Sequence, residues 1–175
     1  MNQSKLEWIL THSSKEKMID YIRSNPLDFD KLIQLIFSDR QPYAWRAAWL
    51  LWSCMEDNDP RVRKYIPGLI SSLPEKPDNM KKDIFTILLR MDIDEEYEGI
   101  LFDHCVSTWE DLGKKPAVRA NALKIMMKIA MKYPDLLSEI DTFTRDIYLQ
   151  NSSTGLKRSV MKRIETLNKS LKNKN

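Results

Sequence analysis

The sequence predicts an all-α fold built from consecutive helix pairs, and three features of its 175 residues lead to this prediction. Only 4 residues are glycine, so the positive-φ turns that a hairpin-rich sheet needs are scarce. No segment alternates apolar and polar residues over enough positions between turn signals to predict a strand. Prolines precede or open the helical patterns, where their fixed φ and missing N–H are tolerated. These prolines are Pro26, Pro42, Pro60, Pro116 and Pro134.

The periodic placement of apolar residues predicts a series of helices along the whole chain. The first two are short and precede the pairs. The expected ranges are 4–11, 14–24, 28–38, 42–56, 60–73, 78–91, 95–110, 116–132, 134–149 and 153–171. Capping residues support three of the helix starts: Ser13 with Glu16 forms a candidate capping box, and Asp59 and Asp78 are candidate N-caps.

The first helices of the pairs share one apolar pattern, which indicates an internal repeat. The segments 60–73 and 95–110 place corresponding residues at i, i+3, i+4, i+7, i+8 and i+11. In the first segment these are Val62, Tyr65, Ile66, Leu69, Ile70 and Leu73; in the second they are Tyr97, Ile100, Leu101, His104, Cys105 and Thr108. The same pattern begins earlier with Phe29, Leu32, Ile33, Ile36 and Phe37.

The second helices of the pairs align on a basic residue near their start. Arg46, Lys82, Arg119 and Arg158 follow one another at spacings of 36, 37 and 39 residues. Three positions further on, the helices carry Trp49, Phe85, Ala122 and Met161, and six positions further on they carry Trp52, Leu88, Ile125 and Ile164. The repeat therefore has a period of about 37 residues and gives about four helix pairs.

Three tryptophans form a stripe on one predicted helix, in the stretch PYAWRAAWLLW. Trp45, Trp49 and Trp52 have the spacing i, i+4, i+7, so they lie on one side of a helix. Such a stripe is either core or binding surface. We expect Trp49 and Trp52 in the core because stacked pairs bury these repeat positions against one another. Trp45 comes earlier in the helix and could instead line a surface.

The chain resembles HEAT and armadillo-type repeat proteins over about residues 26–171. DPRVRKYIPGLISSL and PAVRANALKIMMKIA are similar to HEAT helices, with an early basic residue and aliphatic residues at core offsets. The resemblance implies a right-handed α-solenoid of about four pairs and a single domain over 1–175. The expected repeats are 26–56, 60–91, 95–132 and 134–171, with 1–25 as an N-terminal cap. Family members often pair a turn Asp with the basic residue of the second helix, for which Asp39 and Asp111 are the candidates.

Basic residues are the candidates for function because charge is unevenly distributed along the chain. Residues 114–132 and 152–175 together carry a net charge of +12, and the rest of the chain carries −9. Such asymmetry indicates either an anionic partner or solvated helix surface. The candidate surface comprises Arg46, Lys82, Arg119, Lys124, Lys128, Arg158 and Lys162. The aligned residues either bond one repeat to the next or line the concave groove of the solenoid that the resemblance implies.

Reactive chemistry has little support in the sequence, so we expect no catalytic residue, no metal and no cofactor. His104 and Cys105 fall on a packing stripe, and adjacent helical residues point about 100° apart, which rarely lets both bind one ion. The acidic cluster Asp92, Asp94, Glu95, Glu96 and Glu98 lies at a helix start, where negative charge is favourable. Neither a glycine-rich phosphate loop nor a hydrolase motif occurs.

These observations favour a non-enzymatic interaction or scaffold module with another protein as its partner. The alternative is a nucleic-acid-binding protein that uses the basic C-terminal half. DNA-alkylation-repair glycosylases are built on similar helical repeats, but none of their catalytic positions is matched here. We expect a cytoplasmic protein without a membrane span, because there is no long apolar run and no signal-peptide pattern. Cys54 and Cys105 are expected as free thiols.

Overall fold

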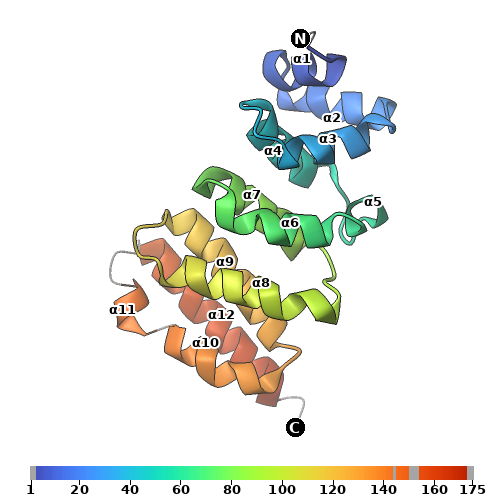
Figure 1. The fold of residues 1–175 in the computed structure, drawn as a ribbon. Helices are drawn as coiled ribbons and strands as arrows, with labels where there is room; N and C mark the ends of the chain where they lie inside the picture. Colours follow the sequence, from blue (N-terminus) through green and yellow to red (C-terminus); the bar gives the residue numbers. More distant parts are fainter. Residues whose placement is uncertain (1–2, 144, 150–153, 173–175) are drawn as a thin grey trace. The chain divides into compact units, whose positions relative to one another are not determined.

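The computed structural model describes residues 3–143, 145–149 and 154–172, and every regular element within these ranges is a helix. The predicted all-α fold of successive helix pairs is confirmed (Figure 1). The chain forms two compact units, Met1–Ile93 and Asp94–Asn175, called here the N-terminal and C-terminal units. The right-handed sense of the repeat and the single domain over 1–175 stay predictions.

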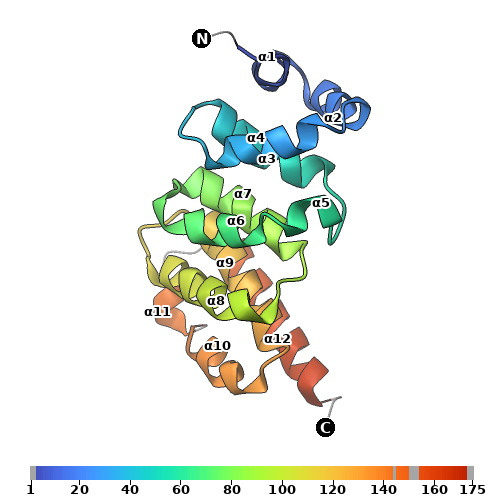
Figure 2. The same cartoon turned by 45° about the vertical axis from the view of Figure 1, so that its right-hand side comes forward.

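The N-terminal unit consists of two short leading helices and two pairs. Its helices are α1 (Lys5–His12), α2 (Lys15–Ser24), α3 (Asp28–Phe37), α4 (Tyr43–Cys54), α5 (Pro60–Arg63), α6 (Ile66–Ser72) and α7 (Asp78–Leu89), with the 3-10 helix η1 (Leu73–Glu75) before α7. Helix α4 is central, since it packs against α1, α2, α3 and α7. Figures 1 and 2 show α6 and α7 side by side as the second pair.

The core face of α4 is made of alanine and leucine rather than tryptophan. Ala44, Ala47, Ala48 and Leu51 are fully buried at i, i+3, i+4 and i+7. The tryptophans begin one residue later, so their stripe is rotated about 100° from this face. Because alanine lets four neighbouring helices approach closely, it occupies the packed side. Trp45, Trp49 and Trp52 are only half-buried, so the prediction that Trp49 and Trp52 belong to the core is wrong.

The half-buried tryptophans nevertheless contact neighbouring helices. Trp52 Nε1 donates a hydrogen bond to Asp83 Oδ1 on α7 over 3.2 Å. Lys15 Nζ of α2 lies 5.6 Å from the ring centroid of Trp49 and 5.5 Å from that of Trp52. An ammonium at this distance from an aromatic face is attracted by the ring quadrupole. The stripe therefore joins α4 to α2 and α7 at the edge of the core.

The helix expected over 60–73 is broken into α5, α6 and η1. Pro67 lies in the first turn of α6 and has no N–H to donate. Its ring would clash with the carbonyl of Arg63, four residues earlier, in a continuous helix. Helix α5 accordingly ends at Arg63 and α6 begins at Ile66. The apolar periodicity that predicts a single helix over 60–73 does not account for Pro67.

Helix caps agree with the sequence at one of three positions. Asp59 caps α5 as predicted, accepting a hydrogen bond from the Arg61 backbone N–H. The capping box is formed by Ser4 and Glu7 at α1, whereas Ser14 rather than Ser13 caps α2. Asp78 is the first residue of α7 instead of its N-cap. Neighbouring serines have the same cap propensity, so sequence alone does not select between them.

The C-terminal unit contains the other two pairs. Its helices are α8 (Glu95–Glu110), α9 (Pro116–Ala130), α10 (Leu137–Phe143), α11 (Asp146–Leu149) and α12 (Thr154–Lys172), with the 3-10 helix η2 (Pro134–Leu136) before α10. Helix α9 packs against α8, α10 and α12. Figures 1 and 2 show α8 and α10 in front of α9 and α12 within this unit. The helix expected over 134–149 is divided among η2, α10 and α11.

Trp109 is the largest fully buried side chain of the C-terminal unit. It lies near the end of α8 and is 0% exposed. Its Nε1 donates a 2.7 Å hydrogen bond to the backbone carbonyl of Phe143, which fastens α8 to the end of α10. A buried indole N–H needs such an acceptor, because an unpaired buried donor costs about 1–3 kcal/mol.

Candidate functional site

The two predicted basic residues of the N-terminal unit both contact their own chain. Arg46 is half-buried and donates from one guanidinium nitrogen to the Leu10 carbonyl over 2.7 Å. Its guanidinium carbon lies 5.0 Å from the Trp45 ring centroid. Lys82 Nζ lies 3.2 Å from Asp83 Oδ1 in the next position of α7. Arg46 thereby joins α4 to α1, whereas the Lys82 contact stays within α7.

Arg119 is buried, with 2% of its surface exposed. Its guanidinium donates to the backbone carbonyls of Trp109 and Tyr148, each over 2.8 Å, and lies 4.6 Å from the Trp109 ring centroid. Burial lowers the pKa of Arg119, and the negative charge of Asp111 opposes this shift. The expected Asp–Arg pair is thus replaced by Arg–carbonyl bonds. A guanidinium enclosed in this way is not accessible to a partner.

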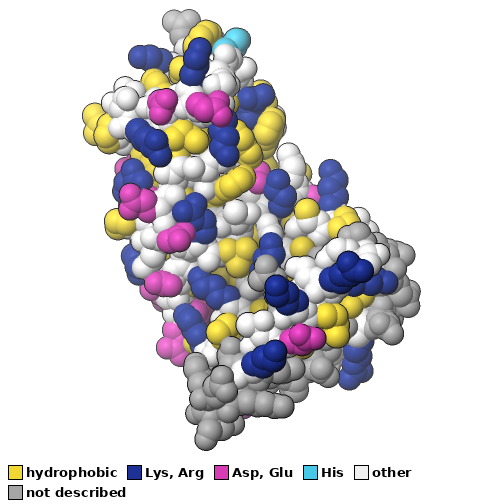
Figure 3. Space-filling view, turned by 180° about the vertical axis from the view of Figure 1, so that it is seen from behind, with side chains coloured by type: hydrophobic (Ala, Val, Ile, Leu, Met, Phe, Trp, Pro, Cys, Tyr) yellow, Lys and Arg dark blue, Asp and Glu magenta, His cyan; other side chains and the backbone are white. Residues whose placement is uncertain are grey.

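The remaining candidates lie on α9 and α12. Lys124 and Lys128 are half-buried, and Lys124 Nζ donates to Asn121 Oδ1 over 2.9 Å. Arg158 and Lys162 are exposed and lie one helical turn apart on α12. Figure 3 shows Lys and Arg side chains interspersed with acidic and hydrophobic ones on this side of the molecule. A basic surface around Arg158 and Lys162 stays a prediction.

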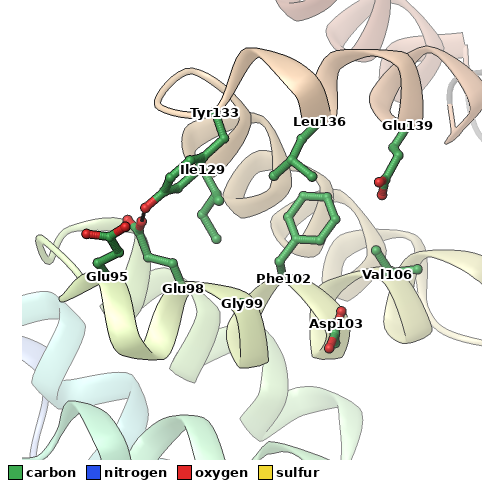
Figure 4. Close-up of a pocket in the computed structure, with 10 residues that line it drawn as sticks. All are labelled: Glu95, Glu98, Gly99, Phe102, Asp103, Val106, Ile129, Tyr133, Leu136 and Glu139. Atoms are coloured by element: carbon green, nitrogen blue, oxygen red, sulfur yellow. Dashed lines mark hydrogen bonds between the residues drawn. The ribbon is translucent and has the colours of Figure 1, made fainter.

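A pocket of about 490 Å³ opens in the C-terminal unit between α8 and the segment that runs from the end of α9 through η2 to α10 (Figure 4). We call it the acidic pocket. Its middle is apolar and is formed by Phe102, Val106, Ile129 and Leu136. Its carboxylates are Glu95, Glu98, Asp103 and Glu139. Glu95 and Glu98 lie at one end and Glu139 at the other, with the apolar side chains between them.

One face of α8 supplies most of the lining, and the helical repeat explains why. Residues 95, 98, 99, 102, 103 and 106 line the pocket, and they follow the spacing i, i+3, i+4, i+7, i+8, i+11. Gly99 lies in the middle of this face, and a Cβ built there would meet nothing within 4 Å. The missing side chain therefore leaves open space, although glycine costs a helix interior about 1 kcal/mol relative to alanine.

Glu98 is the enclosed carboxylate of the acidic pocket, with its side chain 4% exposed. Lys132 Nζ forms an ion pair with Oε1, and Tyr133 Oη donates to Oε2 over 2.8 Å. The hydrogen bond to Glu98, together with burial and the charges of Glu98 and Glu95, raises the pKa of Tyr133 to about 12. Tyr133 consequently stays a hydrogen-bond donor at physiological pH. Lys132 and Tyr133 both come from the connection after α9, and they bring a cation and a phenol to α8.

The sequence prediction missed the acidic pocket by attributing the acidic cluster to a helix start. A usable signal was present, because Glu95, Glu98 and Phe102 share one face of α8 with Gly99. What the sequence could not supply was Glu139 and Leu136 on the opposite wall, more than thirty residues away. Their approach depends on how the segment after α9 folds back over α8.

The two cysteines are free thiols, and burial raises the pKa of each. Cys105 is 0% exposed, and burial raises its pKa well above the usual value for a thiol. Burial likewise raises the pKa of Cys54 to about 11. Within the described ranges, no group of three or more His, Cys, Asp and Glu side chains could hold a metal ion. No helix in those ranges is long and apolar enough to cross a membrane.

Comparison with known proteins agrees with the repeat pattern. No curated protein and no solved structure matches the chain. A family model, described as a HEAT repeat domain, matches residues 2–167 and so covers the helix pairs of both units. The resemblance drawn from the paired helices and from the register of Arg46, Lys82, Arg119 and Arg158 is thereby confirmed. The chain belongs to the HEAT repeat domain family.

Proposed function

We propose that this protein is a non-enzymatic interaction module that binds another protein. Helical repeats bury one face of each helix pair against its neighbours and leave extended surfaces on which partners bind. The observation that carries the proposal is the acidic pocket, which lies between helices of the C-terminal unit and combines apolar side chains with carboxylates. Binding sites are typically concavities of roughly 300–1,000 Å³ with an apolar lining and a few polar groups.

The contacts of the basic residues support a protein partner over a nucleic acid. Arg119 is enclosed, and Arg46 and Lys82 contact their own chain. Nucleic-acid binding needs accessible cations, since each neutralised phosphate contributes through counterion release. The alternative function therefore rests on α12, where Lys157, Arg158, Lys162 and Lys169 are exposed beside the single acid Glu165.

Affinity purification from native lysate, with and without nuclease, tests the proposal. We expect a protein partner that is retained in stoichiometric amount after nuclease treatment. Loss of all captured material with nuclease would favour the nucleic-acid alternative, as would binding of DNA or RNA that falls steeply between low and physiological salt. If no protein is retained, the proposal is wrong. A cytoplasmic location is part of the proposal and is checked by cell fractionation.

A further inference from the structure

We infer that the acidic pocket binds a short segment of a partner protein in which Lys or Arg side chains flank an apolar side chain. The inference rests on the proposed function, because it assigns a partner chemistry to the same pocket. It depends on three observations within the C-terminal unit: the distribution of carboxylates, the pairing of Glu98 and the open space at Gly99.

The charge of the pocket calls for a cationic occupant. Helix α8 carries five acidic residues and no Lys or Arg. Glu95 and Glu98 mark one end of the pocket, and Glu139 comes from α10 at the other end (Figure 4). In the part of the chain that the structure describes, no ion pair involves Glu95 or Glu139. An anionic ligand would meet repulsion at both ends, whereas basic groups would meet attraction.

The chain itself shows that a carboxylate at one end of the pocket pairs with a cation. Lys132 Nζ pairs with Glu98, and Tyr133 supports the same carboxylate from the other oxygen. This pairing engages Glu98, so Glu95 and Glu139 are the carboxylates at the two ends that form no ion pair in the described part of the chain. A ligand cation at either end would form an ion pair with a glutamate, as Lys132 does with Glu98.

The middle of the pocket calls for an apolar group between the cations. Phe102 and Leu136 face each other across it, and Val106 lies toward the end with Glu139. Lys and Arg carry long aliphatic stems that pack on apolar surface while their charged ends stay solvated. The open space beside Gly99 leaves room for the intervening side chain. Together these features select a basic–apolar–basic segment over an isolated cation.

A peptide titration of the full chain tests the inference. The probe is an acetylated, amidated Arg-Leu-Arg tripeptide, and the matched control is Glu-Leu-Glu. Binding is followed through backbone amide shifts of the isotope-labelled protein. We expect saturable changes at Gly99, Phe102 and Tyr133 with the basic peptide alone. Raising the salt concentration should weaken them, because exposed charge pairs are screened.

Two pairs of variants locate the binding. Gly99→Leu places a side chain in the open space and should abolish the shift changes, whereas Gly99→Ala should retain them. Both substitutions favour the helix, and thermal melting confirms that each folds. Glu95→Gln with Glu139→Gln should weaken binding about fivefold, as expected for two partly exposed ion pairs. Glu96→Gln with Glu165→Gln removes two carboxylates outside the pocket and should leave the affinity within about twofold.

Three outcomes of the peptide, variant and sedimentation measurements overturn the inference. The first is saturable binding of Glu-Leu-Glu, and the second is an equal loss of Arg-Leu-Arg affinity with both pairs of Gln substitutions. The third is a dimer, seen by sedimentation, that is lost in Gly99→Leu, because the pocket would then bind a second copy of the chain. Affinity purification separates this inference from the proposed function. A partner retained equally by wild type and Gly99→Leu contradicts the inference and leaves the interaction function standing. Failure of the wild type to retain any protein contradicts the function itself.

Discussion

Arg46 of the N-terminal unit and Arg119 of the C-terminal unit occupy the same position of the repeat and make the same kind of contact. Each donates from its guanidinium to a backbone carbonyl of another helix or connection, and each lies over a tryptophan ring. Both stand near a helix start, where the helix dipole disfavours positive charge. The bonds to carbonyls offset this disadvantage. At these two positions, the aligned basic residue is therefore a structural bridge.

The difference between the two arginines lies in how completely each is enclosed. Arg119 reaches two carbonyls, is 2% exposed and lies over a fully buried tryptophan. Arg46 reaches one carbonyl, and both it and Trp45 are half-buried. The same sequence register thus yields a core bridge in one unit and a peripheral bridge in the other. The position in the repeat predicts that the arginine donates to a backbone carbonyl. How deeply neighbouring helices bury the arginine determines how much this contact contributes to the free energy of unfolding.

The tryptophan beneath each arginine should show the largest difference between the units. Trp109→Ala removes a fully buried ring and its hydrogen bond to Phe143, so we expect a loss of about 4–5 kcal/mol in the free energy of unfolding. Trp45→Ala removes a half-buried ring and should cost about 2 kcal/mol. Chemical denaturation of both variants measures the difference. Equal losses would contradict the distinction between core and peripheral bridge.

Replacing Arg119 should be the next most costly change. Arg119→Met keeps an apolar stem but leaves the carbonyls of Trp109 and Tyr148 without their donor, so we expect a loss of about 3 kcal/mol. Arg158→Met is the matched control, because Arg158 has the same register but is exposed. Its effect should stay within about 0.5 kcal/mol. If the two variants unfold alike, Arg119 does not form a buried bridge in solution.

Arg46→Met should cost less than Arg119→Met because only one carbonyl loses its donor and water can replace it. We expect about 1–1.5 kcal/mol, measured by the same denaturation experiment. Arg23→Met, at an exposed arginine of α2, controls for the loss of a charge from the same unit. A loss as large as that of Arg119→Met would mean that the peripheral bridge is as enclosed as the core one.

The sequence predicted what depends on local pattern and register. The range 95–110 reproduces α8 residue for residue, because its apolar period and its acidic start are both local features. The wrong core assignment of Trp49 and Trp52 has a tertiary cause. Ala44, Ala47 and Ala48 allow closer helix packing, and they turned the tryptophans to the edge. Sequence spacing identified the tryptophan stripe of α4 but not the alanine face beside it.

The candidate site shows the same limit. The alignment of Arg46 with Arg119 was visible in the sequence, but their burial depends on α1 and on the segment around Tyr148. The acidic pocket needs a second wall from η2 and α10, which no periodicity within α8 reveals. Local reasoning therefore found the acidic cluster at the start of α8 without finding the cavity beside it.

The smallest expected change in stability depends on whether an arginine binds a carboxylate or a carbonyl. Arg61 and Arg119 provide this contrast. Arg61 binds the Asp59 carboxylate, which is 1% exposed, whereas Arg119 binds carbonyls, which do not titrate. Burial raises the pKa of Asp59, but hydrogen bonds from the Arg61 side chain and from the backbone N–H groups of Glu56 and Arg61 outweigh it. The pKa of Asp59 therefore lies below its usual value.

A carboxyl whose pKa is lower in the folded state stabilises the protein above its unfolded pKa of about 3.9, and this contribution disappears as the pH falls through the folded pKa. Asp59→Asn keeps an N-cap residue, so we expect it to cost about 1 kcal/mol near neutral pH and progressively less below about pH 4. The cost of Arg119→Met should change less over the same range, since its hydrogen-bond partners are carbonyls, which keep their charge state. Thermal melting of both variants from neutral to acid pH measures the two trends. A constant cost for Asp59→Asn would show that Asp59 acts only as a cap, because an ion pair with Arg61 must weaken when the carboxylate is protonated.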